Sequence, residues 1–417
     1  MRVTQQRGDR ELAQLLVDGS ADTMRWLRRN GVRFAPLYQW QFEQPDGRIK
    51  FAGGSAVGVA GGGAGLAEAL FKSAEQSGVT VVYGARAVSL IEGEHGVTGV
   101  RVREATRSGA RSVDLSASAV VLASGGFEAN AEWRTRYLGP GWELAKVRGS
   151  RFNSGDGLRM ALEAGAMPCG NWSGCHSASW DLGAPDVNEL KLGAVFKRDD
   201  FLYGIMVNAR GERFVDEGAD IRALTYARMG RAILAQPGQV AWQIYDRKVA
   251  HLLHDEYRAP PATRYRGATL AELAGQLDGI DRAALQATIA EFNRAVRQDM
   301  PFDPGKKDGR STSGVVVPKS NWASTIDEPP FEAFPVTCGI TFTFGGVRTD
   351  RDARVLDVDG AVIPGLYAAG ELVGGLFYFN YPGGSGLMAA AVFGRIAGRA
   401  AARQALAGHA PARSAVR

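Results

Sequence analysis

One short stretch of the chain gathers the side chains that proton chemistry requires. The sequence GERFVDEGADIRALTYARMG, residues 211–230, places Glu217, Asp220 and Arg222 within six positions. An arginine can form a forked pair with a carboxylate, and acids beside it can carry protons. The stretch therefore predicts either a carboxylate-binding and proton-delivery patch or a solvated, charged loop.

A single histidine offers a second candidate. His176 stands in WSGCHSASWD, where an imidazole could bind an anion or serve only the structure. Cys169 and Cys175 lie near it, but the three residues lack the close paired spacing of a zinc site. We expect no metal site, and both roles stay open for His176.

Two apolar, β-rich runs end in glycine. The run SAVVLAS leads to Gly125 and Gly126, and the run GLYAA leads to Gly370 and Glu371. A dinucleotide cofactor lies across the carboxyl ends of parallel strands, where glycine leaves room for the pyrophosphate and an acid accepts hydrogen bonds from hydroxyl groups. The alternative is a pair of tight turns in an ordinary α/β protein. Together the two runs favour a flavin or nicotinamide dinucleotide.

A glycine-rich turn leads into the last long helix, in the stretch YPGGSGLMAAAVFGRIAG. The predicted helix begins near Ser385, and its start comprises Gly384, Ser385, Gly386, Leu387 and Met388. Unpaired N–H groups and the positive end of the helix dipole favour negative charge there, including charge on a reduced flavin ring. The alternative is a capped core helix whose small residues allow close packing.

The surrounding elements indicate more than one domain for the 417 residues. The 54 glycines are roughly twice the usual share of ~7%, which indicates backbone that a ligand approaches closely. Helical spacing predicts a helix over residues 9–29, capped by Asp9, and an apolar run predicts a buried strand over residues 79–84. Aromatic, charged and proline residues dominate residues 176–330, so we expect an inserted second domain there, between residues 1–175 and 331–406, and a disordered tail over residues 407–417.

Charge and cysteine content narrow the partners and the compartment. The 49 basic and 44 acidic residues are interspersed, so the net charge of +5 forms no stripe that would bind nucleic acid. No apolar run reaches the ~18 to 20 residues of a transmembrane helix, and the stretch MRVTQQRGDRELAQLL lacks an apolar signal segment. The three cysteines fit reduced thiols, so we expect a cytoplasmic protein.

With these motifs and several longer strings, the chain resembles the flavoprotein dehydrogenases of the fumarate reductase and succinate dehydrogenase group. The resemblance runs from about Val3 to Gly398, and within the group it is strongest to the FAD-dependent enzymes that oxidise tricarballylate. The strings that carry it are TCGITFTFGGVRTD, GIMVNARGERFVDEGAD, RAILAQPGQ, SGCHSASWD and PGLYAAGELVGGLFYFNYPGGSGLMAAAVFGRIAG. It implies an α/β flavoprotein, with a Rossmann-like FAD-binding domain interrupted by an α+β capping domain and the substrate held between them.

The resemblance also implies how FAD is held. Ser124, Gly125 and Gly126 would approach the adenosine and pyrophosphate, Glu371 would approach the ribityl chain, and residues 385–388 would approach the pyrimidine edge of the ring. The group begins with a strand, a G-x-G-x-x-G turn and a helix, but GGSAVGVAGGGAG contains no such match and no apolar strand precedes it. We therefore expect Met1 to be an internal start, with the first βαβ segment absent.

On the substrate side, His176 matches the substrate histidine of the capping domain, and Arg222 matches the catalytic arginine, with Arg228 as its competitor. The stretch TFTF, residues 341–344, stands where fumarate reductases have a histidine, and Tyr381 stands where they have a substrate arginine. Both differences favour a polycarboxylate such as tricarballylate over fumarate or succinate, with His176 and Tyr381 as substrate-binding residues.

The reaction that the resemblance implies is the oxidation of tricarballylate to cis-aconitate, in which a base removes a proton α to a carboxylate and a hydride passes to flavin N5. Arg222 would carry the proton. Because a free arginine is a poor base, Arg222 would hand that proton to Glu217 or Asp220. The resemblance also implies a redox partner that reoxidises the flavin, a membrane-bound iron–sulfur protein, since the chain has no cysteines with cluster spacing of its own.

Two other readings remain open at this point. The lack of a phosphate-binding turn favours a noncatalytic remnant of a flavoprotein that serves as a binding module. Alternatively, the chain is an enzyme of the same group that acts on fumarate or succinate, on a ketosteroid or on a corrin precursor.

Overall fold

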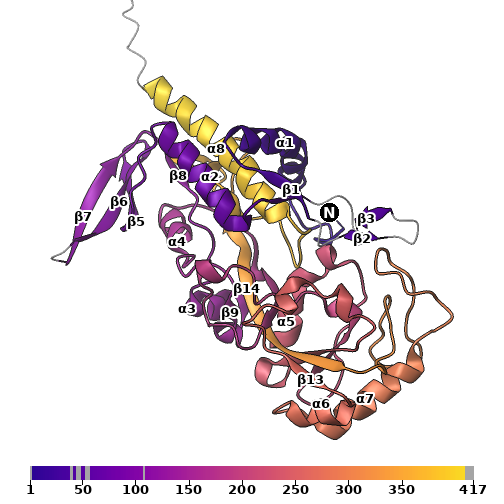
Figure 1. Cartoon of the computed structure of the whole chain (residues 1–417). Coiled ribbons are helices and arrows are strands. Elements are labelled where there is room, and N and C mark those ends of the chain that lie inside the picture. The colour runs from indigo at the N-terminus through magenta and orange to yellow at the C-terminus, as the bar shows by residue number, and fades with distance from the viewer. Residues whose placement is uncertain (1, 38–40, 44–47, 52–56, 107–108, 409–417) are drawn as a thin grey trace, which may run out of the picture.

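A computed structural model gives the fold and describes residues 2–37, 41–43, 48–51, 57–106 and 109–408 (Figure 1). The helices are α1 (Arg10–Arg29), α2 (Gly62–Gln76), α3 (Ala131–Trp133), α4 (Asp156–Glu163), α5 (Met229–Leu234), α6 (Leu270–Gln276), α7 (Arg282–Ala295) and α8 (Ser385–Gly408). The strands of the first half are β1 (Phe34–Pro36), β2 (Gln41–Glu43), β3 (Ile49–Phe51), β4 (Val57–Val59), β5 (Ala85–Gly93), β6 (Gly96–Thr106), β7 (Gly109–Ser116), β8 (Val120–Leu122), β9 (Lys146–Val147) and β10 (Pro168–Asp181). Those of the second half are β11 (Ile205–Asn208), β12 (Ala241–Tyr245), β13 (Tyr265–Gly267), β14 (Phe331–Val347), β15 (Arg354–Leu356) and β16 (Val362–Ala368).

The first helix follows its sequence signals. The side chain of Asp9 accepts hydrogen bonds from the backbone N–H groups of Glu11 (2.9 Å) and Leu12 (3.1 Å), which satisfies two donors that a helix start leaves unpaired. The helical positions Leu12 and Leu27 are buried. In Figure 1 α1 lies against α8, and its bounds confirm the predicted helix over residues 9–29.

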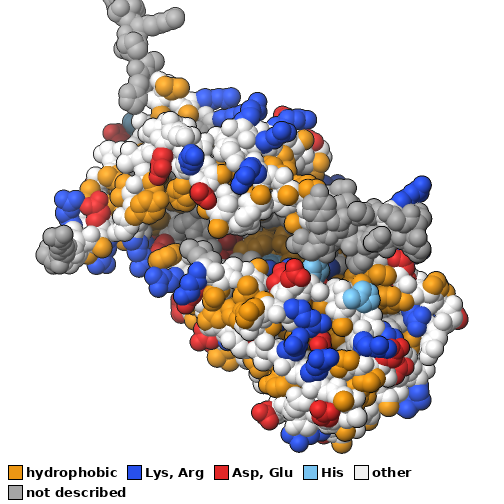
Figure 2. Space-filling view, viewed as in Figure 1, with side chains coloured by type: hydrophobic (Ala, Val, Ile, Leu, Met, Phe, Trp, Pro, Cys, Tyr) orange, Lys and Arg blue, Asp and Glu red, His pale blue; other side chains and the backbone are white. Residues whose placement is uncertain are grey.

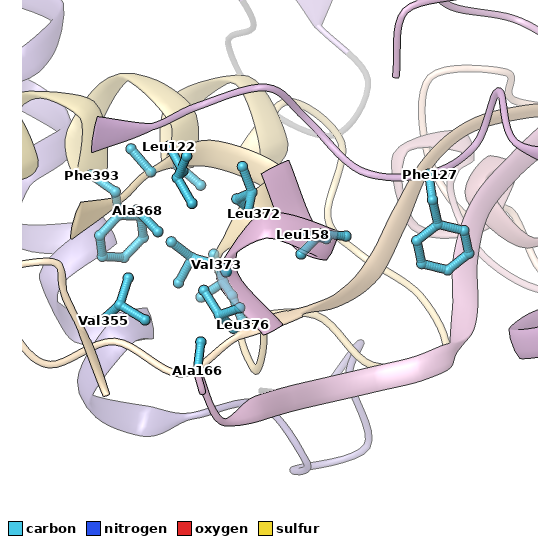
Figure 3. Packing of buried hydrophobic residues seen from close by; sticks show 14 of the residues in the cluster. Leu122, Phe127, Leu158, Ala166, Val355, Ala368, Leu372, Val373, Leu376 and Phe393 are labelled. Carbon is cyan, nitrogen blue, oxygen red and sulfur yellow. The ribbon is translucent and has the colours of Figure 1, made fainter. Parts of the chain in front are cut away.

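A small sheet in the order β15-β16-β8 carries the expected cofactor side of the molecule. Strands β8 and β16 are parallel, with Leu122 beside Ala368, so their carboxyl ends meet at one edge of the sheet. Figure 3 shows Leu122 and Ala368 packed with Phe393 of α8 and with Leu372, which follows β16. The buried apolar side chains of this cluster hold the sheet against α8.

A second sheet joins the two halves of the molecule, in the order β10-β14-β12-β11 with β9 and β13 also paired to β14. The 17-residue strand β14 pairs with β10 over most of its length and with β12 and β13 near its start. Strand β10 runs across the domain boundary expected at residues 175/176, and β14 begins directly after the boundary expected at residues 330/331. Behind this sheet, α6 and α7 contribute Leu273, Leu285 and Phe292 to a separate core.

The strand predicted over residues 79–84 is wrong. These residues form no strand, and Val79, Val82 and Tyr83 are 54%, 55% and 75% exposed. A continuous apolar strand needs neighbouring elements that bury it. Within the described ranges β8 pairs only with β16, and the preceding helix α2 has no buried side chain, so neither element covers residues 79–84. Residues 52–56 of the glycine-rich loop and residues 409–417 of the predicted tail lie outside the described residues. Over the ranges that the structure covers, no helix has the length and apolar content needed to cross a bilayer.

Candidate active site

The two glycine turns predicted from the sequence lie together. Because β8 and β16 are parallel neighbours, Gly125-Gly126 and Gly370-Glu371 follow them at the same edge. A Cβ atom on Gly126 would lie 2.0 Å from Oε1 of Glu371 and 2.2 Å from Oγ1 of Thr343, so only glycine fits this position. Ser124, which directly precedes this Gly-Gly turn, is exposed.

Two buried carboxyl groups face each other behind these turns. Glu371 Oε1 accepts hydrogen bonds from the backbone N–H of Thr343 (2.7 Å) and from its hydroxyl (3.0 Å). Burial and the charge of Glu371 raise the pKa of Glu128 well above its usual range, and burial likewise raises the pKa of Glu371. The pair therefore holds a proton to higher pH than a free carboxylate does. Sequence reasoning missed Glu128, although an acid directly after the Gly-Gly-Phe turn was its signal.

A cavity of about 310 Å³ opens beside Glu371. One wall is the start of α8, where the predicted first helical residue, Ser385, is confirmed and Gly384 has a φ of +84°. Leu387 lines the cavity and is 61% exposed, while Met388 packs against the core. The complete lining is Thr341, Phe342, Thr343, Phe344, Gly370, Glu371, Val373, Leu376, Phe377, Tyr381, Gly386, Leu387, Ala389, Ala390 and Phe393. Figure 2 shows a hollow with hydrophobic side chains in its floor, between the body that carries α8 and the body that carries α6 and α7.

His176 stands in a cluster of aromatic rings next to this cavity. Its ring centroid lies 5.0 Å from Tyr226, 5.0 Å from Tyr381 and 5.5 Å from Phe342, which stacks on it. The hydroxyls of Tyr226 and Tyr381 are hydrogen-bonded to each other. Neither ring nitrogen of His176 has a hydrogen-bond partner among the described residues. Since Tyr381 and Phe342 also line the cavity, this aromatic cluster forms the boundary between the cavity and the capping part of the chain.

Burial sets the charge of this cluster. It lowers the pKa of the His176 imidazole well below the usual value and raises the pKa of both tyrosine hydroxyls, Tyr226 and Tyr381. At neutral pH all three groups are uncharged and act as hydrogen-bond donors or acceptors. The predicted pair His176 and Tyr381 is thus brought together, whereas nothing in the sequence around Tyr226 signalled its part in the cluster.

The segment with the predicted catalytic residues docks on the loop that carries Tyr381. The Gly383 N–H donates to the Ala223 carbonyl at 2.9 Å, and the Asn380 amide donates to the Leu224 carbonyl at 2.7 Å. These bonds hold Arg222 at the same junction, with its side chain only 14% exposed. Its sequence competitor, Arg228, is exposed.

The acid beside Arg222 is Asp200. Arg222 Nη1 lies 3.7 Å from Asp200 Oδ1, and the same oxygen lies 2.6 Å from His254 Nδ1. The other oxygen, Oδ2, accepts the backbone N–H of His254 at 2.7 Å. Burial alone would raise the pKa of Asp200, but hydrogen bonding to His254 and the charges of His254 and Arg222 outweigh it and lower that pKa. An ionised acid thus connects the arginine to a histidine ring.

The two acids predicted to serve Arg222 have other partners. Glu217 is fully buried and forms a two-point ion pair with Arg213, with Nη2 to Oε2 at 2.5 Å. Asp220 pairs at its partly exposed edge with Arg2 (3.5 Å) and Lys307 (3.4 Å). The physical reason is chain direction: Glu217 points into the core of the inserted segment, and Asp220 points to its surface. The acid that the structure places beside Arg222 is thus neither of these two but Asp200, 22 residues before it.

Comparisons with known proteins show that the chain is similar to flavoproteins. Residues 1–387 match the family model described as FAD binding domain. A probable fumarate reductase of Shewanella frigidimarina is 29% identical over 415 residues, which cover 97% of this chain and 63% of the relative. A 4-oxocyclohexanecarboxylate 2-dehydrogenase of Sinomonas cyclohexanicum is 31% identical over 386 residues, which cover 88% of this chain and 64% of the relative. The open conformation of a flavocytochrome c3 fumarate reductase superposes with a TM-score of 0.72 at 29% identity, covering 97% of this chain and 66% of that one.

The chain spans 62–65% of the length of the fumarate reductases that it matches. Its residues nevertheless fit FAD. The cavity has the apolar lining and exposed Leu387 that a flat ring would cover, Gly370 lines it without a side chain, and the start of α8 supplies N–H groups that a helix leaves unpaired.

Proposed function

The chain belongs to the FAD binding domain family, and from this we propose that it is an FAD-dependent dehydrogenase that oxidises a CH–CH bond of a small polycarboxylate. The substrate that we propose is tricarballylate, with cis-aconitate as product. The observation that carries the proposal is the docking of residues 222–224 on the loop of residues 380–383, which holds Arg222 and Tyr226 against the wall of the cavity that fits the flavin. Bound FAD supplies the hydride acceptor.

Substrate binding, proton transfer and the exclusion of water are the steps that we assign to residues of the chain. His176 and Tyr381 offer uncharged hydrogen-bond donors to substrate carboxylates, and the rings of Phe342 and Tyr226 pack against the carbon skeleton. Arg222 gives a proton from Nη1 to the ionised Asp200 as it takes the proton that leaves the carbon α to a carboxylate, so the guanidinium ends the step with the charge it had at the start. The aromatic cluster and the buried side chains around it exclude water from the reacting atoms.

The route out of the site continues through His254. Its Nδ1 lies 2.6 Å from Asp200 Oδ1, and its side chain is 11% exposed. The proton therefore passes from a buried acid to a ring whose other nitrogen, Nε2, is buried without a hydrogen-bond partner among the described residues. This sequence of groups replaces the relay through Glu217 or Asp220 that the sequence predicted.

The first experiment is the visible spectrum of the purified chain with FAD, before and after tricarballylate is added without an electron acceptor. We expect a bound flavin band that bleaches, with cis-aconitate formed in an equal amount. An Arg222→Gln variant that binds FAD but does not bleach would support the assigned role. Bound flavin that no carboxylate bleaches would refute dehydrogenation and favour the noncatalytic remnant.

A second candidate is oxidation next to the carbonyl of a cyclic keto acid. The observation that favours it is the hydrogen-bonded pair of Tyr226 and Tyr381, since two neutral hydroxyls can donate to a ketone oxygen and stabilise the charge that forms there. One relative is named 4-oxocyclohexanecarboxylate 2-dehydrogenase. Bleaching by 4-oxocyclohexanecarboxylate but not by tricarballylate would select this candidate.

The electron acceptor that we propose is a separate, membrane-bound iron–sulfur protein. The chain has three cysteines in all, and Cys175 and Cys338 are buried in the core, so it offers no set of thiolates for a cluster of its own. Reoxidation of the reduced flavin by a membrane fraction, but not by the same fraction stripped of iron, is the outcome that we expect.

A further inference from the structure

Arg148 reaches the aromatic cluster from a part of the chain that no sequence motif connected with the site. Strand β9 pairs in parallel with β14, with Val147 beside Ile340, and the Arg148 N–H then donates to the Ile340 carbonyl at 2.8 Å. Two residues further along β14, Phe342 pairs with His176 on β10. Arg148 therefore leaves the sheet at the level of the His176 ring.

The guanidinium of Arg148 has no acid to balance it. Its Cζ lies 5.2 Å from the ring centroid of Trp180, and its Nη1 is buried without a hydrogen-bond partner among the described residues. No ion pair joins Arg148 to an acid in the part of the chain that the structure describes. A partly buried cation without an anion is costly, so the arrangement is favourable only when an anion arrives.

The charge of Arg148 acts on the substrate side of the site. Together with burial it lowers the pKa of His176, and it partly offsets the effect of burial on the pKa values of Tyr226 and Tyr381. His176 adds two ring nitrogens without partners, and Thr341 adds a buried hydroxyl without one. The unpaired atoms of His176 and Thr341 and the hydroxyls of Tyr226 and Tyr381 thus lie on the same side of the site as one cation. Such an environment suits a carboxylate and disfavours a second cation.

We propose that Arg148 binds a carboxylate of the substrate, with the His176 ring as an additional hydrogen-bond donor, and that this subsite selects acids over neutral molecules of the same shape. The subsite rests on the proposed function, because it places the ligand at the same junction. The apolar rings of Phe342, Phe344 and Phe377 then contact the carbon skeleton, so one charged group and an apolar body are recognised together.

The test measures binding separately from turnover. The FAD-loaded protein is titrated with tricarballylate and with 4-oxocyclohexanecarboxylate, and the Kd of each is read from the change in the flavin spectrum. We expect Arg148→Gln to raise the Kd by about 10- to 100-fold, as loss of a charge-assisted hydrogen bond does, and Arg148→Lys to restore part of the affinity. The matched control is Arg151→Gln, which removes the same charge three residues further along the chain. Because the side chain of Arg151 is exposed and lies over Phe152, we expect this variant to change the Kd by less than about twofold.

A neutral ligand separates the subsite from general damage. Trimethyl tricarballylate has the same skeleton without charge, and we expect its affinity to be weak and equal in wild type and Arg148→Gln. Equal losses in Arg148→Gln and Arg151→Gln would overturn the subsite, because they would show only long-range attraction. A wild-type spectrum that neither acid perturbs would overturn it as well, whereas binding without bleaching would refute the proposed oxidation and leave the subsite supported.

Discussion

Replacing Asp200 by asparagine tests which acid serves Arg222. The variant keeps the size of the side chain and an oxygen toward His254, but it removes the negative charge 3.7 Å from Arg222 Nη1. Two unit charges at this separation interact by about 4 kcal/mol at an effective dielectric constant of about 20. Asp200 is 2% exposed and Arg222 14%, so water screens the pair little. We expect kcat to fall on the order of 10²- to 10³-fold with a smaller change in KM.

The assay is the rate of flavin bleaching in a single turnover, because it excludes reoxidation by the acceptor. The rival variant is Asp220→Asn, in which the acid predicted from the sequence loses its pairs with Arg2 and Lys307. A normal rate in Asp200→Asn, or an equal loss in Asp220→Asn, would refute the reasoning.

Stability gives Asp200 a second, independent readout. Its pKa is lower in the folded protein than the usual value of about 3.9, so its contribution to stability is present above about pH 4 and is lost as the pH falls through the folded pKa. The Tm values of wild type and Asp200→Asn should therefore differ at neutral pH and converge in strong acid. A Tm difference that persists unchanged into strong acid would show that the variant acts on packing and not on charge.

Three further variants test the buried groups described above. Gly126→Ala should abolish FAD binding and lower the stability by about 1–3 kcal/mol, because the new Cβ would lie 2.0 Å from Glu371 Oε1; flavin absorbance and a urea melt measure both. Glu128→Gln should raise the Tm of the FAD-free protein at pH 7 and leave it unchanged near pH 4. The pKa of Glu128 is raised in the folded protein, so its carboxyl group favours folding while it is protonated. This contribution to stability declines as the pH rises above about 4.3, the usual pKa of a glutamate in an unfolded chain. Asp181→Asn should lower the stability by about 3–5 kcal/mol in a urea melt, because Arg198, also fully buried, would lose the charge 2.6 Å from its Nη2.

Each of these has a matched control in the chain. Gly394→Ala adds a Cβ with no atom within 4 Å, Glu132→Gln changes an exposed acid near Glu128, and Asp114→Asn breaks an exposed pair with Arg101. We expect little change from all three. Retained FAD in Gly126→Ala, a Tm gain in Glu128→Gln that grows toward acid, or a loss in Asp181→Asn no larger than in Asp114→Asn would each contradict the corresponding argument.

The parts of the site that local patterns encode could be predicted from the sequence. The turns at Gly126 and Gly370 follow strands whose parallel pairing brings their ends together, and the start of α8 at Ser385 follows from a turn and a run of helix-forming residues. The apolar run over residues 79–84 carried an equally clear local pattern, yet it is exposed. The difference is tertiary: β8 has β16 beside it, while within the described residues no strand forms a ladder with residues 79–84.

The contacts that define the chemistry come from distant segments and carry no local signal. Asp200 lies beside Arg222 although 22 residues separate them, and Arg148 reaches the same sheet as His176 because a two-residue strand, β9, joins the long strand β14. The periodicity of a helix or strand indicates which of its faces is buried, but it does not indicate which residues of distant segments lie together. The charged stretch around Arg222 predicted a proton carrier there, but the nearest acids in the sequence, Glu217 and Asp220, pair with Arg213, Arg2 and Lys307.

The long strand β14 limits how the molecule could be cut or recombined. At about 3.3 Å per residue its 17 residues extend for roughly 55 Å, from the pairing with β12 to the wall of the cavity. An exchange of residues 176–330 for the corresponding segment of a relative would leave half of β10 and the whole of β14 in the recipient. The grafted segment would then have to form the backbone hydrogen bonds of this sheet with strands of the recipient, in addition to joining the chain at its two ends. Chimeras with junctions in the loops outside β10 and β14 would keep that ladder within one parent, and these are the recombinants that we expect to fold.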